Sequence, residues 1–405
     1  MTSPGVASSG GASSRDPQAE TPAAGPEPET AVSVRDAETA PPSEAVTERE
    51  QRVLGIIETA RAKRGKFRDA HITMAHGAGG KATQSLIEGL LVPALRSGTD
   101  ALAELADAGA VTVGGARLAM TTDSFVVKPL RFGGGSIGDL AVNGTVNDLA
   151  MAGARPVALT LSLVLEEGLS ADDLRFEVEA IAAAARAAGV EVVAGDTKVV
   201  ERGSCDGMYI CTTGIGEVDE RASLSPTALS PGDRILLSGS IGEHGTAIML
   251  ARGEFDLGAD VDSDTCSLWP AVDALLTAAG PQLRCLRDAT RGGVASVLNE
   301  LARASDVAML VREADVPVSP VVAGAAELLG IDPMHIANEG KLVALVAPEA
   351  AEAALAALRS VPGGEQAAEI GEVKTSPGGM VLMQTAFGGR RVMDMLVGDP
   401  LPRIC

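Results

Sequence analysis

The apolar positions change their spacing along the chain in a way that predicts alternating strands and helices. The predicted elements of the first half are strands at 117–126, 156–166, 190–200 and 208–218 and helices at 136–154 and 170–189. The second of these helices has Ser170 as its N-cap, Asp173 at the capping-box position and Gly189 as its end. This order of elements is typical of an α/β domain.

The alternation is interrupted at residues 225–233, where SPTALSPGD places two Ser-Pro pairs and a Pro-Gly pair close together. The elements predicted beyond this break are strands at 234–242 and 341–348 and helices at 244–255, within 288–305 and at 349–361. A chain of 405 residues is longer than one core usually supports. The sequence therefore predicts two layered α/β domains, at 70–224 and 233–375, followed by a C-terminal segment at 376–405.

Residues 1–48 consist mainly of Pro, Ala, Ser, Gly, Thr and acidic residues. Too few apolar side chains are present to offset the entropy of ordering such a segment, so we expect a disordered acidic extension. A short basic helix is predicted at 50–68, and the folded body is predicted to begin near Ile72.

Composition narrows the possible functions. A net charge of −21 opposes binding to nucleic acid, and an aromatic content of 2% supplies few side chains for base stacking. The sequence contains neither the apolar region of a signal peptide nor eighteen consecutive apolar residues, so we expect no standard secretion and no membrane span. The five cysteines, without CxxC spacing, favour a reducing cytoplasm over disulfides or a zinc site.

Two glycine-rich segments are candidate anion sites, because backbone N–H groups at the start of a helix can meet an anion. HGAGGKAT, residues 76–83, supplies Gly77, Gly79 and Gly80 but lacks the spacing of a P-loop. The segment DATRGG adds Arg291. An ordinary helix cap explains the first segment equally well, and a turn with a solvent-facing arginine explains the second.

Aspartates recur at strand ends or beside glycines, where their carboxylates could hold a hard cation such as Mg²⁺. These aspartates are Asp123, Asp139, Asp148 and Asp196. The alternative for each is a helix cap or a turn. Asp148 stands inside an apolar helical stretch where a cap is unnatural, and an unpaired buried carboxylate there would be costly, so a cation is a reasonable partner.

Glu339 and Lys341 flank a glycine just before an apolar strand in HIANEGKLVALV. Glu339 has the chemistry of a general base, and Lys341 that of a contact to a phosphate or a carboxylate. A solvated ion pair is the interpretation that these residues favour when they are taken alone.

These segments, in this order, resemble the HypE family of hydrogenase maturation proteins, which are carbamoyl dehydratases. The matching stretches are HGAGG, TTDSFVVKPL, GTVNDLAMAGARP, AGDTKVVERG, TRGGVASVLNEL, IANEGK and the final PRIC. The resemblance implies two PurM-like domains of the AIR synthetase type, with the sheet of the first domain forming a homodimer interface. It also implies that ATP and Mg²⁺ bind in a groove between the two domains.

The resemblance also implies roles for individual residues. Cys405 would accept a carbamoyl group from the carbamoyltransferase HypF, and ATP-dependent loss of water would convert it into a thiocyanate. The cyano group would then pass to an iron centre on HypC–HypD. Glu339 would act as the base, and Lys198 would orient the carbamoyl oxygen or a phosphate. The metal ligands would be Asp123, Asp148 and Asp196. The nucleotide-binding residues would be Gly77, Gly79, Gly80, Asp123, Asn147, Asp148, Asp196, Thr197 and Arg291.

Pro400 and Pro402 precede Cys405 and favour an extended backbone. About seven residues beyond Gly398, at roughly 3 Å each, would carry the sulfur on the order of 20 Å, so we expect a flexible tail that swings between an internal site and a partner. A cysteine at this position is not expected to lie in a core. The neighbouring α-carboxylate is expected to raise the pKa of the thiol.

Two other functions stay open at this stage. One is another ATP-dependent enzyme of the same superfamily, such as thiamine-phosphate kinase or selenophosphate synthetase, although the latter would need a reactive cysteine early in the first domain and none precedes Cys205. The other is a non-enzymatic carrier that binds nucleotide only for stability. Hydrolysis of ATP that depends on a carbamoylated Cys405 would separate these functions from a dehydratase.

Overall fold

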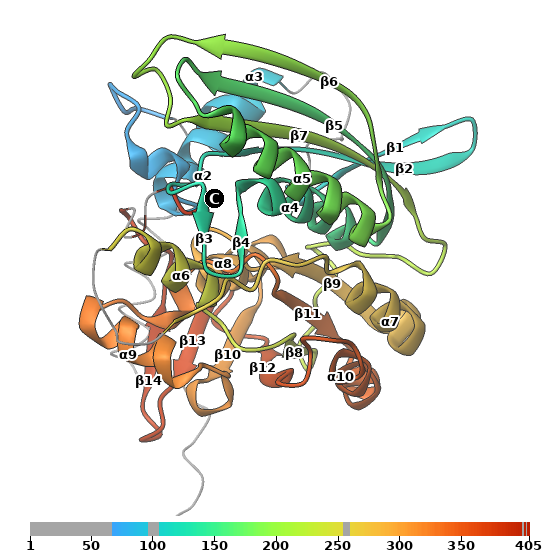
Figure 1. Cartoon of the computed structure of the whole chain (residues 1–405). Helices are drawn as coiled ribbons and strands as arrows, with labels where there is room; N and C mark the ends of the chain where they lie inside the picture. The colour runs from blue at the N-terminus through green and yellow to red at the C-terminus, as the bar shows by residue number, and fades with distance from the viewer. Residues whose placement is uncertain (1–66, 96–104, 254–259, 399–400, 402) are drawn as a thin grey trace, which may run out of the picture. The chain divides into compact units, whose positions relative to one another are not determined.

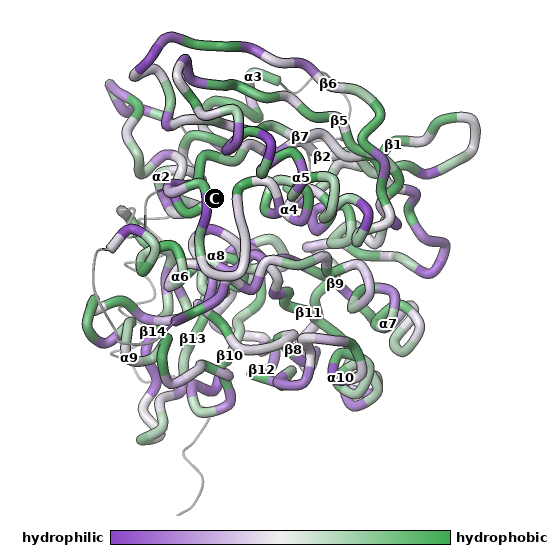
Figure 2. Tube along the Cα trace, in the orientation of Figure 1, coloured by the Kyte–Doolittle hydropathy of each residue, from purple (hydrophilic) through white to green (hydrophobic). Residues whose placement is uncertain are grey.

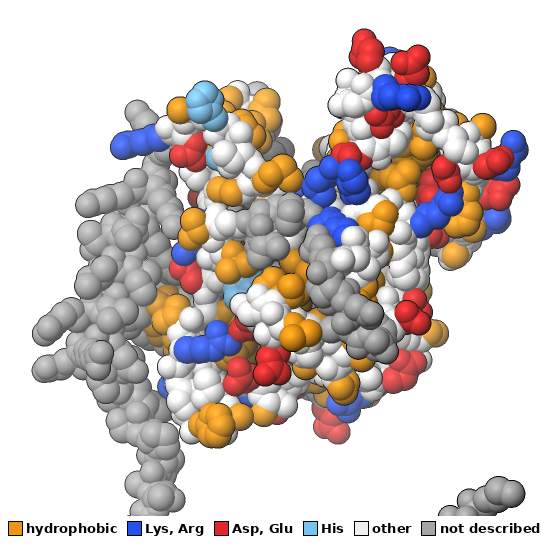
Figure 3. Space-filling model, turned by 60° about the vertical axis from the view of Figure 1, so that its left-hand side comes forward, with side chains coloured by type: hydrophobic (Ala, Val, Ile, Leu, Met, Phe, Trp, Pro, Cys, Tyr) orange, Lys and Arg blue, Asp and Glu red, His pale blue; other side chains and the backbone are white. Residues whose placement is uncertain are grey.

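The computed structural model describes residues 67–95, 105–253, 260–398, 401 and 403–405, which belong to one compact unit that begins at Val53. The predicted extension at 1–48 and nearly all of the helix predicted at 50–68 lie outside the described residues. Two sheets with their helices make up most of the described part (Figure 1). No helix among the described residues is long and apolar enough to cross a membrane. Acidic and basic side chains are interspersed on the face drawn in Figure 3.

The first sheet has five strands in the order β1-β2-β7-β5-β6. Its strands are β1 (Gly109–Val113), β2 (Ala116–Phe125), β5 (Ala154–Glu166), β6 (Glu191–Val200) and β7 (Met208–Val218). Only the β5–β6 pair is parallel, because helix α5 (Ala171–Ala188) provides the crossover between these strands. Ser170 caps α5 and Gly189 ends it at φ 69°, which confirms both predictions, whereas Asp173 forms an ion pair with Arg131 at 2.8 Å.

Helix α4 (Ile137–Met151) is buried along most of its length and lies between the two domains. It contacts β2, β5 and β7 of the first sheet, and it also contacts β9 and α7 of the second domain. A helix that is buried on nearly all sides is typical of a protein interior, and Figure 2 shows that α4 carries hydrophilic residues among its hydrophobic ones. Because of this position, polar side chains on α4 are held at the junction of the domains.

The second sheet has seven strands in the order β14-β13-β10-β12-β8-β11-β9. Its strands are β8 (Arg234–Leu237), β9 (Leu283–Asp288), β10 (Ala308–Arg312), β11 (Leu342–Val346), β12 (Ala368–Lys374), β13 (Met380–Gln384) and β14 (Arg390–Met393). Its helices are α6 (Glu243–Ala251), α7 (Trp269–Ala279), α8 (Gly293–Ala304), α9 (Pro320–Leu329) and α10 (Ala351–Ser360). Because β13 and β14 belong to this sheet, the second domain extends to Met393, and the boundary predicted at residue 375 was too early.

Short elements join the domains. The first described segment contains a 3₁₀ turn (Met74–Gly77), α2 (Lys81–Leu86), a π-helical turn (Ile87–Leu91) and α3 (Val92–Leu95). A two-stranded sheet, β3 (Arg131–Phe132) and β4 (Gly135–Ser136), precedes α4.

The tail ends inside the protein. Figure 1 marks the C-terminal end near β3, and Leu401, Ile404 and Cys405 belong to a hydrophobic cluster that includes Phe132. Cys405 is 8% exposed, so the expectation that it lies outside a core was wrong. The burial of Leu401 and Ile404 accounts for this, because removing their apolar side chains from water stabilises a position in which Cys405 is also buried.

Candidate functional site

The thiol of Cys405 lies against the carboxyl group of Glu339, which precedes β11 in the second domain. Burial raises the pKa of the Cys405 thiol far above its ordinary value; Arg291 opposes this shift, and the hydrogen bond with Glu339 adds to it. The sequence predicted a raised pKa but attributed it to the α-carboxylate, whereas burial is the main cause. The docked thiol therefore stays protonated and unreactive.

Glu339 is a buried carboxyl group that is partly free to bind something else. It is 3% exposed, and its Oε1 has no hydrogen-bond partner among the described residues. Burial raises the pKa of Glu339 well above its ordinary value, and the negative charges of Asp288 and Asp123 raise it further. Its backbone N–H donates to Oδ1 of Asp264 at 3.0 Å, which fixes its position. These properties are typical of a general base.

Three aspartates gather beside this pair from separate elements: Asp123 on β2, Asp148 on α4 and Asp288 at the end of β9. Burial raises the pKa of each of them. Asp288, Asp107 and Asp123 raise the pKa of Asp148 further, in that order, which shows that their charges act on one another. The cluster therefore holds negative charge that the described protein groups do not fully compensate.

Sequence reasoning missed Asp107 and Asp288 as members of this cluster. Asp288 stands at the end of a buried strand next to a glycine-rich turn, and the same criterion had selected Asp123 and Asp196. Asp107 lies just before β1 and forms an ion pair with Arg287, a contact over 180 residues that no local pattern indicates.

The cluster fits a metal ion that is shared with a substrate. Among the residues that the structure describes, no group of three His, Cys, Asp or Glu side chains is placed to hold a metal ion alone. Mg²⁺ usually takes one or two carboxylates and completes its shell with water and phosphate oxygens. Asp123 and Asp148 can supply such carboxylates, and Oγ1 of Thr121 orients Asp148 by donating to its Oδ2 at 2.7 Å.

Asn147, which the sequence predicts to bind nucleotide, forms hydrogen bonds within the protein through its side-chain amide. Its amide nitrogen donates to the backbone oxygens of Cys266 at 2.9 Å and Glu339 at 3.2 Å, and its Oδ1 accepts from the N–H of Leu268 at 2.7 Å. With both donors and its acceptor engaged, Asn147 holds Glu339 in place.

The predicted residues Asp196, Thr197 and Lys198 are not brought to this cluster within one chain. All three lie on the exposed edge strand β6, where Lys198 forms an ion pair with Asp196. The hydrogen bond from Lys198 lowers the pKa of Asp196, as expected for an exposed pair. The described chain thus places these residues apart from Asp123 and Asp148.

Two glycines of HGAGG, Gly79 and Gly80, are required by close packing. A Cβ atom at Gly79 would lie 2.5 Å from the backbone oxygen of Arg291, and one at Gly80 would lie 2.5 Å from that of Leu396. Arg291 also donates to the backbone oxygen of Gly77. These contacts join the glycine turn to the N-terminal end of α8, so the two predicted anion segments meet.

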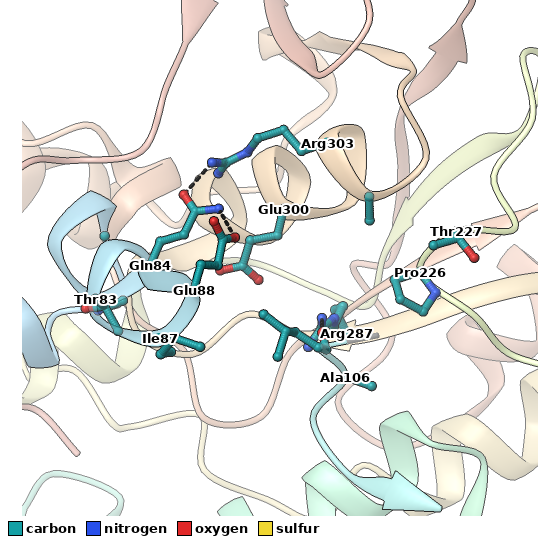
Figure 4. Close-up of a pocket in the computed structure, with 14 residues that line it drawn as sticks. Thr83, Gln84, Ile87, Glu88, Ala106, Pro226, Thr227, Arg287, Glu300 and Arg303 are labelled. Carbon is teal, nitrogen blue, oxygen red and sulfur yellow. Dashed lines mark hydrogen bonds between the residues drawn. The ribbon is translucent and has the colours of Figure 1, made fainter. Parts of the chain in front are cut away.

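Two cavities lie beside Arg287, the residue that precedes Asp288 of the carboxylate cluster. One of about 520 Å³ is lined by Gly79, Gly80 and Arg287, among others, and Figure 4 shows Gln84, Glu88, Glu300 and Arg303 around it. Another of about 500 Å³ is lined by Asp107 and mostly apolar residues. Both include Arg287 in their walls. Neither cavity is lined by Glu339 or Cys405.

Comparison with known proteins identifies the class. Residues 105–218 match the N-terminal domain and residues 230–383 the C-terminal domain of the family described as AIR synthase related protein. The fold and the site thus define a two-domain AIR synthase-related protein. A thiamine monophosphate kinase from Aquifex aeolicus, 19% identical with a TM-score of 0.53 over 76% of this chain and 96% of its own, shares the fold alone.

Closer relatives give the family. The carbamoyl dehydratase HypE of Bradyrhizobium diazoefficiens is 49% identical over 84% of this chain and 97% of its own. A crystal structure of the hydrogenase maturation protein HypE in complex with ATP is 46% identical, with a TM-score of 0.69 over 83% of this chain and 100% of its own. HypE in a HypE–HypF complex is 44% identical, with a TM-score of 0.73 over 77% and 99%. The chain belongs to the HypE family of carbamoyl dehydratases.

Proposed function

We propose that this protein removes water from a carbamoyl group on Cys405, using ATP, and so makes a thiocyanate that supplies the cyanide ligand of a NiFe-hydrogenase iron. The observation that carries the proposal is the contact between the Cys405 thiol and the buried, partly unpaired Glu339. A group attached to this sulfur would lie beside a candidate base and beside aspartates that suit a bound phosphate and its metal.

The carbonyl oxygen of S–C(=O)–NH₂ attacks the γ-phosphorus of ATP, and ADP leaves. Glu339 takes one proton from nitrogen, and phosphate then leaves and takes up the second N–H proton, which forms S–C≡N. Phosphate replaces oxide as the leaving group, and this makes the dehydration feasible. Burial raises the pKa of Glu339, so its carboxylate has a higher affinity for a proton than an exposed one.

ATP is proposed to bind in the cavities beside Arg287, with its phosphates reaching Arg291 and the N-terminal end of α8. Asp123 and Asp148 would hold Mg²⁺ here, and Asp288, close to both, is a further candidate ligand. Mg²⁺, when bound, neutralises charge on the transferred phosphoryl group. Burial raises the pKa of all three aspartates, and repulsion from neighbouring carboxylates adds to this for Asp148 and Asp288. A bound cation would favour their charged forms, which supports this assignment.

A homodimer is proposed to complete the site. The two edge strands of the first sheet, β1 and β6, are exposed along nearly their whole length. They carry exposed apolar side chains, namely Val111, Val113, Val192, Val193 and Val199. Exposed apolar edges of this kind favour pairing with another chain. Pairing of these sheets would bring Lys198 and Asp196 of the partner subunit toward the cluster.

Cys405 has to leave its buried position to be charged, because its thiol is protonated and enclosed when docked. We propose HypF as the source of the carbamoyl group, since a relative of similar length is known in a HypE–HypF complex. We propose HypC–HypD as the acceptor of the cyano group, on the family resemblance.

Single-turnover hydrolysis of ATP tests the function. ADP is expected to form in a burst that equals the amount of carbamoylated Cys405, and uncharged protein and Cys405→Ala are expected to give no burst. ADP formation that ignores the state of Cys405 would instead support a small-molecule kinase. Binding of ATP without any hydrolysis would support the carrier.

A further inference from the structure

The terminal dipeptide Ile404–Cys405 is held from both domains. The backbone oxygen of Cys405 accepts a hydrogen bond from the N–H of Val126, at the end of the first domain's β2, at 3.1 Å. The backbone oxygen of Ile404 lies 2.6 Å from Nε2 of His244 on α6 of the second domain. His244 is completely buried, and the edge of its ring meets Phe132 at a centroid distance of 5.5 Å. The ring is therefore fixed in both position and plane.

The partners of His244 define its tautomer. A carbonyl oxygen can only accept, so Nε2 carries the proton and donates to Ile404. Nδ1, 2.8 Å from Oγ of Ser263, then accepts the hydroxyl proton of that serine. Burial lowers the pKa of His244 in spite of the opposing charge of Asp264, which keeps the ring neutral, as this pattern requires.

The loop that orients His244 also orients Glu339. Oγ of Ser263 accepts the N–H of Thr265 at 3.1 Å, which closes a tight turn around Asp264. Asp264 accepts the N–H of Glu339 at 3.0 Å and forms a buried ion pair with Lys341 at 3.2 Å. Consecutive residues thus connect the histidine that holds the tail with the carboxyl group that faces its thiol.

We propose that His244 is a positioning residue, which holds the backbone oxygen of Ile404 so that the side chain of Cys405 stays beside Glu339. Ser263 supports this role by fixing the ring tautomer. The consequence for dehydration rests on the proposed function, but the docking of the tail does not. Removing the ring nitrogens should raise the fraction of molecules with an undocked tail. Dehydration, which needs the docked tail, should slow, whereas charging of Cys405 by the transferase should not.

Alkylation of the native protein by iodoacetamide, followed by peptide mapping, tests docking. His244→Phe keeps the aromatic volume and is expected to speed labelling of Cys405 about tenfold, because a buried hydrogen bond is lost. Ser263→Ala removes only the tautomer-fixing hydroxyl and is expected to give a smaller rise, about threefold. Cys285, 3% exposed in the second domain's core, serves as the internal reference for general unfolding.

His335→Phe is the matched control. His335 also contacts a backbone oxygen near the tail, that of Asp394 at 3.1 Å, but it does not touch the terminal dipeptide. Labelling of Cys405 should stay at the wild-type rate in this variant. Unchanged labelling in both His244→Phe and Ser263→Ala would overturn the proposal. So would equal acceleration at Cys405 and Cys285, which would show that the domain itself has opened.

A kinetic comparison separates positioning from a merely structural role. In carbamoylated His244→Phe, the rate of single-turnover dehydration is expected to fall about tenfold. The KM for ATP is expected to stay the same, and charging by the transferase is not expected to slow. Slower dehydration together with a higher KM for ATP and slower charging would contradict a positioning role. If wild-type Cys405 accepted no carbamoyl group, the proposed function would fail, and the alkylation rates alone would decide whether His244 docks the tail.

Discussion

The buried pair Glu339–Cys405 and the exposed pair Asp196–Lys198 differ in almost every physical respect. In the first, burial raises the pKa of both groups, and one carboxyl oxygen has no hydrogen-bond partner among the described residues. In the second, Asp196 and Lys198 form an ion pair with each other on the solvent-exposed edge strand β6. The first pair is brought together within a single chain. The other has a predicted role that a single chain does not explain, which is why we propose a shared site in a dimer.

The strongest test of the buried pair is Glu339→Gln, which keeps the shape of the side chain but removes the base. Dehydration of carbamoylated Cys405 is expected to fall by about 10²–10⁴-fold, while charging by the transferase continues. Quantification of the carbamoyl and thiocyanate adducts by mass spectrometry measures both steps. Glu372→Gln, on β12 and paired with Arg234 at 3.1 Å, is the control and should keep wild-type turnover. Dehydration at the wild-type rate in Glu339→Gln would show that Glu339 is not the base.

The exposed pair is tested by mixing subunits. Lys198→Ala and Cys405→Ala should each lose turnover alone, because each lacks one half of every site. An equal mixture that exchanges subunits freely should recover about a quarter of the wild-type turnover, since half of the dimers are mixed and each has one complete site. Multi-angle light scattering of the mixture monitors the dimer. No recovery despite exchange would mean that Lys198 acts within its own chain, and wild-type turnover of Lys198→Ala alone would mean that Lys198 has no role.

A third prediction concerns Asp148, whose raised pKa has a consequence for stability. A carboxyl group with a raised pKa in the folded state binds more protons there than in the unfolded state. The free energy of unfolding of the nucleotide-free protein should therefore fall as pH rises from the ordinary aspartate pKa to the raised value. Asp148→Asn removes this contribution, so its melting temperature at neutral pH should equal or exceed that of the wild type by a few degrees, ~2–4 °C.

The same variant should lose the rise in melting temperature that Mg²⁺ and ATP together give the wild type. Differential scanning fluorimetry across a pH series measures both effects. Asp139→Asn on the same helix is the matched control: Asp139 completes the capping box with Ser136, so its replacement should lower the melting temperature but preserve the nucleotide effect. A large fall in melting temperature for Asp148→Asn would show that Asp148 is a structural residue.

The smallest effect is expected from removal of residues 1–48. These residues contribute none of the groups in either pair, so turnover should stay within about twofold of that of the full chain. Their composition is poor in apolar residues, which gives little reason to expect a larger effect of the truncation on turnover. A progress curve for thiocyanate formation is sufficient to measure this. A loss of activity would assign the acidic extension a role that neither pair contains.

Much of this arrangement could be predicted from local patterns. The start and end of α5 follow from Ser170 and Gly189, whose conformations are set by their own chemistry. Asp148 stood out because a carboxylate within an apolar helix needs a partner. Both deductions depend on neighbours close in sequence, where periodicity and capping operate.

The remaining features depend on contacts between distant segments. Burial of Cys405 requires Val126, His244 and Glu339 to meet, and no single stretch of sequence carries that information. The use of Asn147 to hold the backbone of Glu339 is invisible for the same reason. The family resemblance named both Glu339 and Cys405, and the fold adds that these residues meet and that Asn147 donates to the backbone of Glu339.

Intact-protein mass spectrometry of the wild type tests the central claim most directly. The protein is first incubated with carbamoyl phosphate, Mg²⁺, ATP and the transferase. ATP is then withheld or restored for the second step, the dehydration, and the C-terminal peptide is mapped. The account predicts a carbamoyl adduct on Cys405 that loses one water only when ATP is available for the second step. An unmodified Cys405 beside full ATP turnover on a small molecule would contradict it.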